Sequence, residues 1–143
     1  MAGTGSEVVD RLVEATRAHD APAMVACFHE DYRSEQPLHP DAGFVGREQV
    51  GKNWSSMFAE VPDLAFDVLR SARAGDEVWT EVHVHGRHTD GRSFDYRGMA
   101  VWGLRDELIA WARLYFETVE VGGAGIEERT KQVLGNDRAT EPS

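Results

Sequence analysis

The chain has 143 residues, 41% of them apolar, which suits a single domain with one hydrophobic core. It carries 25 acidic residues against 15 Lys and Arg, and its net charge of −10 would repel a phosphate backbone or an anionic lipid surface. We therefore expect neither nucleic acid nor a membrane as a partner. The lone cysteine, Cys27, excludes an internal disulfide.

The first ten residues, MAGTGSEVVD, lack the basic start and continuous apolar run of a signal peptide. No apolar segment approaches the roughly 20 residues that are needed to cross a bilayer. These two observations predict a cytoplasmic protein.

Helical periodicity marks the N-terminal part of the chain. Thr4 and Glu7 have the spacing of a capping box, and apolar residues then recur three and four positions apart, which predicts a first helix. Asp20 is a suitable N-cap for a second helix, which we expect to end near His29. A short extended piece, 32–36, and a turn-rich PLHPDAG stretch follow. A third helix is predicted within GREQVGKNWSSMF, 46–58.

The period changes to two after Pro62, which indicates strands. The predicted strands, separated by turn signals, are 64–73, 77–88, 92–104 and 108–120. Hairpin connections imply antiparallel neighbours, so we expect an α+β domain in which three helices cover one face of a curved sheet. The predicted domain is 1–121. The tail, 122–143, is expected to hold a short helix at 126–134 and then a disordered end.

Strand alternation assigns each side chain of the sheet to one of two faces. The sides that contain Val82, Tyr96 and Leu114 are the more apolar, so we place them against the helices. The stretch HVHGRH is then divided, because His83 and His85 point outward while His88 points inward. These three histidines do not converge on one ion, and we predict no metal site.

The outward face is not fully polar. It carries Trp79, Trp111 and Tyr115 among charged residues, more than a sheet usually exposes to water. This pattern predicts a homodimer that forms through the outer face of the sheet.

Several motifs occur in a fixed order along residues 6–120. They are PLHP and GREQV before the third helix, GDEV at the second long strand, GRHTDGRSFDYRGMAVWGL across a hairpin, and IAWARLYFE on the last strand. Together they resemble the nuclear-transport-factor-two-like superfamily, in its SnoaL-like and limonene-epoxide-hydrolase-like branch. The resemblance implies a cone of curved antiparallel sheet and helices around a deep pocket. Members include polyketide cyclases, steroid isomerases, epoxide hydrolases and proteins without known activity, so the fold does not by itself define a function.

The resemblance does not extend to the catalytic triad of the epoxide hydrolases. The positions of its arginine and two aspartates match Val82, Val84 and Leu114 here. Two further polar positions of that family match Arg33 and Glu35, and Glu117 matches a frequent acidic residue at the end of the last strand, although our face assignment points it outward.

The inward residues predict a pocket for a hydrophobic small molecule. The expected substrate-binding residues are His39, Trp54, Met57, Val82, Val84, Trp102, Leu114 and Phe116. The expected catalytic residues are Glu35, His88, Tyr96 and Arg33. In this interpretation Glu35, desolvated in an apolar cavity, acts as a base while the others donate to a developing oxyanion. Isomerisation, cyclisation, dehydration or epoxide opening needs only this equipment, and no cofactor is predicted.

Each polar candidate also has a structural interpretation, and both stay open. Arg33 and Glu35 suit a solvated ion pair, His88 a turn cap, Tyr96 a core position and His39 a turn residue. The alternative function is a hydrophobic-ligand-binding module without chemistry, or a dimeric interaction domain whose cone is filled by bulky side chains.

Overall fold

The computed structural model describes residues 3–135. The first helix, α1 (Glu7–Arg17), begins after Ser6, whose side chain accepts a hydrogen bond from the Val9 N–H. The prediction of Thr4 as the capping residue is therefore wrong. Thr4 instead bonds to the Asp10 carboxylate through its own N–H and hydroxyl, because the chain reaches the helical conformation two residues later.

The second helix, α2 (Ala21–Val25), has the predicted cap, since Asp20 accepts a hydrogen bond from the Ala23 N–H. It ends at Val25, earlier than the predicted end near His29. The physical reason is that Phe28 already belongs to the sheet, where it pairs with Ile109. The strand β1 (Phe28–Glu35) is correspondingly longer than the predicted extended piece. A 3-10 turn (Pro40–Ala42), the short strand β2 (Phe44–Val45) and helix α3 (Glu48–Glu60) follow.

The four long strands agree closely with the prediction. They are β3 (Ala65–Ala74), β4 (Glu77–Arg87), β5 (Ser93–Arg105) and β6 (Leu108–Thr118). Within the described residues they join β1 and β2 in one six-stranded sheet of order β2-β1-β6-β5-β4-β3. The hairpin neighbours are antiparallel as expected, whereas β1 lies parallel to β6.

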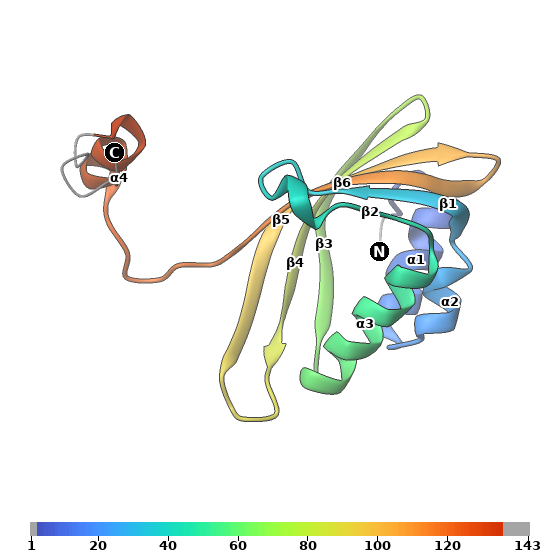
Figure 1. Ribbon diagram of the computed structural model, residues 1–143, viewed down its shortest axis with the longest axis horizontal. Helices are drawn as coiled ribbons and strands as arrows, with labels where there is room; N and C mark the ends of the chain where they lie inside the picture. The colour runs from blue at the N-terminus through green and yellow to red at the C-terminus, as the bar shows by residue number, and fades with distance from the viewer. Residues whose placement is uncertain (1–2, 136–143) are drawn as a thin grey trace.

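The sheet curves around the three N-terminal helices, which lie against its concave side (Figure 1). The predicted inward face is confirmed, because Val82, Ala100 and Ala112 are fully buried in the cores between the sheet and the helices. One close approach shapes this face. A side chain at Gly98 would collide with the Tyr115 carbonyl and the Phe116 ring, so glycine lets Phe116 lie over β5.

The predicted C-terminal helix forms as α4 (Ile126–Leu134) and stands apart from the sheet with all of its residues exposed (Figure 1). The predicted disordered end lies outside the described residues. Within residues 3–135, no helix is long and apolar enough to span a bilayer.

Candidate functional site: an apolar cavity between sheet and helices

A cavity of about 340 Å³ lies on the concave side of the sheet. All three N-terminal helices and the strands β1 to β6 contribute to its wall. The lining residues are Leu12, Thr16, Met24, Phe28, Tyr32, Ser34, Gln36, Phe44, Val50, Asn53, Trp54, Met57, Phe66, Val84, Phe94, Tyr96, Trp102, Leu114 and Phe116. Among these described lining residues none carries a charge, so the cavity is an apolar and aromatic environment with a few neutral polar groups.

The structure brings six of the eight predicted substrate-binding residues to this cavity. They are Trp54, Met57, Val84, Trp102, Leu114 and Phe116. Val82 lies instead in the packed core and is fully buried. His39 is exposed, and its Nε2 lies 3.0 Å from Oε1 of Glu117, which is itself exposed as its outward assignment requires.

Of the four predicted catalytic residues, only Tyr96 lines the cavity. Arg33 and Glu35 lie on the other side of β1, because alternate residues of a strand point to opposite faces. There the Arg113 Nη1 donates to Glu35 Oε2 at 3.0 Å, and both side chains are about two-fifths exposed. The arrangement is that of a solvated ion pair on the outer surface.

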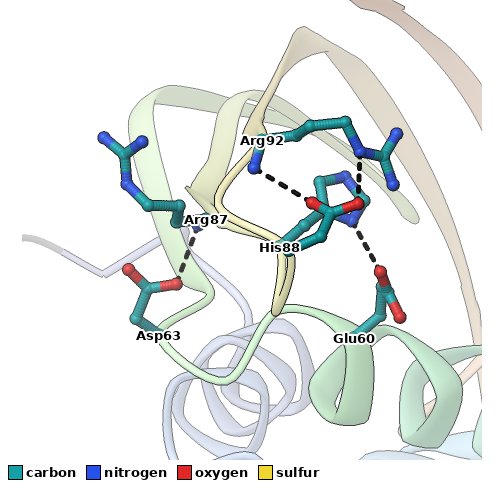
Figure 2. Close-up of polar contacts among 6 residues, drawn as sticks. Glu60, Asp63, Arg87, His88 and Arg92 are labelled. Carbon is teal, nitrogen blue, oxygen red and sulfur yellow. Dashed lines mark hydrogen bonds and ion pairs between the residues drawn. The ribbon is translucent and has the colours of Figure 1, made fainter.

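His88 also has a partner away from the cavity lining. Its Nδ1 lies 3.0 Å from Oε1 of Glu60, at the end of α3 (Figure 2). The β4–β5 turn beside it is closed by Asp90, which accepts hydrogen bonds from the backbone N–H and the side chain of Arg92. The His88–Glu60 contact ties α3 to the hairpin, so this histidine has a structural role, but its side chain does not cap the turn as the structural interpretation expects.

Sequence reasoning missed most of the polar groups that do line the cavity. Tyr32 and Ser34 occupy alternate positions of β1, Gln36 follows directly after its end, and all three line the cavity together with Asn53 of α3. The alternation of the extended piece could have found the first three, because the aromatic ring of Tyr32 marks the buried side. The family resemblance points instead to Arg33 and Glu35, which lie on the outer side of β1.

Tyr32 is the most buried of these polar groups, with 2% of its surface exposed. Burial raises the pKa of its phenol to about 12, and a hydrogen bond with the Ser34 side chain opposes that shift only in part. The phenol therefore keeps its proton at neutral pH and acts as a hydrogen-bond donor.

Other polar atoms of the wall are available to a ligand. The Asn53 Oδ1 accepts from Gln49 at 2.7 Å, so the amide nitrogen of this lining residue can still donate to a ligand. The Tyr96 hydroxyl and the Gln36 amide have no hydrogen-bond partner among residues 3–135. By contrast the Trp102 Nε1 is engaged, because it donates to Thr80 Oγ1 at 3.0 Å.

The outer face of the sheet differs in kind. Trp79 is 44% exposed there, while the Trp111 ring lies against Gly103 on the neighbouring strand. His83 and His85 lie on this face as predicted, each beside an aspartate.

Among the solved structures that share this fold are three from two organisms. A ketosteroid isomerase-like fold protein from Catenulispora acidiphila, in complex with trimethylamine, has 21% identity and a TM-score of 0.68, over 79% of this chain and 86% of that chain. An LEH-like epoxide hydrolase from Mycobacterium tuberculosis has 18% identity and a TM-score of 0.68, over 80% and 83%. A Mycobacterium tuberculosis protein in complex with estradiol-17β-hemisuccinate has 20% identity and a TM-score of 0.65, over 76% and 89%.

A comparison with curated proteins gives no match. The family model of the SnoaL-like domain matches residues 9–112, which include most of α1, all of α2 and α3, and most of the sheet. The chain belongs to the SnoaL-like domain family.

Proposed function

We propose that this protein binds an uncharged, largely apolar small molecule in the cavity on the concave side of the sheet. The observation that carries the proposal is the lining itself, which combines aromatic and aliphatic side chains with neutral donors and no charged group. A volume of about 340 Å³ lies within the range of ordinary ligand sites and suits a molecule of a few fused rings.

The polar groups of the wall define the kind of ligand further. Tyr32, Asn53 and Tyr96 offer hydrogen-bond donors, and an ionic ligand would lose its hydration without gaining a charged partner. A molecule with one or two carbonyl or hydroxyl oxygens on a hydrocarbon skeleton satisfies both conditions. A protein of the same fold was solved with estradiol-17β-hemisuccinate, which supports a steroid skeleton as a first choice, although the hemisuccinate group carries a carboxylate that the proposed neutral ligand lacks.

The sequence predicts acid/base chemistry with Glu35 as the base. The geometry favours ligand binding without that chemistry. A base must reach the proton that it abstracts. Glu35 is bound to Arg113 on the outer surface, and His88 is bound to Glu60. Among the described lining residues no carboxylate or imidazole takes their place.

The test is a titration with estradiol, a neutral steroid, followed by intrinsic tryptophan fluorescence. Trp54 and Trp102 line the cavity, so a bound ligand should change their emission in a saturable manner. The variant Leu114→Phe narrows the cavity and should weaken binding at least about tenfold, equivalent to about 1.4 kcal/mol. The matched control is Glu35→Gln, which alters the outer side of the sheet and should bind as the original protein does.

Equal affinities for the original protein and Leu114→Phe would contradict the cavity as the binding site. A loss of binding in Glu35→Gln would mean that Glu35 contributes to the ligand site, and acid/base chemistry with Glu35 as the base would again be the favoured function. Neutral steroids, polyketide-like polyphenols and terpenes should be tried in turn, since all three fit the same chemical description.

We also keep the prediction of a homodimer through the outer face of the sheet. Its support is the exposure of Trp79 among charged neighbours. Equilibrium sedimentation at micromolar concentration tests it, and a single species of 15.9 kDa would contradict it.

A further inference from the structure

Two histidines and two aspartates gather on the outer face of the sheet, on the side opposite to the cavity. His83 and His85 come from β4, Asp67 from β3 and Asp95 from β5. The strand register explains the gathering, because Asp67 lies opposite His83 on one side and Asp95 lies opposite His85 on the other. Four side chains with metal-binding atoms thus meet across three adjacent strands.

The contacts between them run diagonally across the register. The His85 Nε2 lies 2.8 Å from Asp67 Oδ2, and the His83 Nε2 lies 2.6 Å from Asp95 Oδ1. The two imidazole rings are stacked, with centroids 4.3 Å apart and an angle of 28° between the planes. One ligand atom from each of Asp67, His83 and His85 lies within 4.8 Å of the other two.

The chemistry of this set suits a divalent transition-metal ion. Imidazole nitrogen and carboxylate oxygen are the donors that zinc accepts besides thiolate. With neutral imidazoles the four side chains carry two negative charges from Asp67 and Asp95, which a divalent cation would neutralise. In the single chain the side chains of His85 and Asp67 are 39% and 49% exposed, so an ion can reach them from solvent before two copies pair through this face.

We propose that Asp67, His83 and His85 bind a divalent transition-metal ion of the zinc type on the outer face of the sheet. Asp95 is a positioning residue, since its carboxylate holds the His83 ring in place, as carboxylates commonly do for metal-binding histidines. Water completes the coordination on the exposed side. The ion would join β3 to β4, and because it binds the folded chain it would stabilise it.

The proposed site is not formed by the three histidines of HVHGRH. His88 does not belong to it, because that side chain points to the other face and contacts Glu60 (Figure 2). The third ligand is instead supplied by Asp67, which precedes His83 by 16 residues and reaches it only through the β3–β4 pairing.

The proposal is tested by calorimetric titration of untagged, chelator-treated protein with zinc chloride. We expect one ion per chain. The variants His85→Gln and Asp67→Asn should each weaken binding at least about tenfold, within the range seen when partners of a metal site are removed. The matched control is His88→Gln, which removes a histidine from the same hexapeptide and should leave the affinity within about twofold.

A second measurement separates loss of the site from loss of the fold. Zinc should raise the melting temperature of the original protein and of His88→Gln, whereas magnesium, which prefers oxygen ligands, should not. His85→Gln and Asp67→Asn should melt as the chelated original protein does and show no shift with zinc. The proposal would be overturned if His85→Gln bound zinc as tightly as the original protein does. It would also be overturned if His88→Gln lost as much zinc affinity as His85→Gln does.

Discussion

The two faces of the sheet present different kinds of side chain, neutral and mostly apolar on the concave side and ionisable on the outer side. On β1 the contrast falls between adjacent residues, since Ser34 is 2% exposed on the cavity side while Glu35 forms an ion pair with Arg113 on the other. On β4 it falls between Val84, which lines the cavity, and His83 and His85, which meet aspartates on the outer face.

The difference shows where this fold can place charge. A charged group inside an apolar cavity loses hydration that only a charged partner can offset, whereas at the outer face water solvates it. The cavity accordingly keeps neutral donors such as Tyr32 and Asn53. Ionisable pairs, including Glu35–Arg113 and His85–Asp67, lie outside. The proposed site for a neutral molecule and the proposed site for a metal ion therefore lie on opposite faces of the sheet.

The largest expected effect compares two tryptophans. Trp102→Ala should destabilise the protein by about 3–5 kcal/mol, because the ring is 8% exposed and its Nε1 donates to Thr80. Trp79→Ala, on the outer face with 44% of its surface exposed, should cost about 1 kcal/mol or less. Urea unfolding of both variants measures the difference, and equal losses would break the contrast between the faces.

The next effect concerns the pH dependence contributed by Tyr32. The pKa of its phenol is about 12 in the folded protein and about 10 in the unfolded chain. Between these values the unfolded chain binds fewer protons, so stability falls as the pH rises. The loss should be about 2–3 kcal/mol once the pH passes 12, and it is absent below pH 10.

Urea unfolding from pH 9 to 11.5 checks this expectation. Tyr32→Phe should show a smaller decline than the original protein, because the remaining tyrosines titrate in both. Parallel declines in the two proteins would mean that Tyr32 does not sit in the desolvated environment described above.

A smaller effect compares two tyrosines and rests on the proposed ligand. Tyr96→Phe should weaken estradiol binding by about 0.5–1.5 kcal/mol if its hydroxyl bonds to the ligand. Tyr115→Phe is the matched control, since the Tyr115 hydroxyl lies on the outer face and accepts from Arg113 Nε at 3.3 Å. The affinity of this variant for estradiol should equal that of the original protein. The fluorescence titration measures both, and an equal effect of the two substitutions would remove Tyr96 from the site.

The smallest effect is on the ion pair of the outer face. Glu35→Gln should change the free energy of unfolding by about 1 kcal/mol or less, because both partners are partly exposed and screened by water. The measurement is urea unfolding at low and at high salt. A decrease of several kcal/mol in the free energy of unfolding would indicate that the Glu35–Arg113 pair is buried. The two sides of β1 would then not differ in their exposure to water.

Local patterns predicted much of the fold and part of the site. The period-two runs placed the four long strands and the inward sides of β4, β5 and β6, so Val84, Trp102 and Leu114 were found. The polar side of the cavity, formed by Tyr32, Ser34 and Gln36, was not found although their alternation predicts it, because the resemblance points instead to Arg33 and Glu35. Only the pairing of β1 with β6 has no local signal. The parallel contact of β1 with β6 joins segments about 80 residues apart.

By itself the sequence determined the order of the elements, the face to which each strand residue belongs and the division of HVHGRH between two faces. These properties depend on backbone geometry within a few residues. Only the tertiary structure decided that Glu35 meets Arg113, that His88 meets Glu60, and that Asp67 completes a cluster with His83 and His85. These contacts depend on the register between strands and on the position of α3 against the sheet. Packing of the whole core sets both, and no local sequence pattern encodes them.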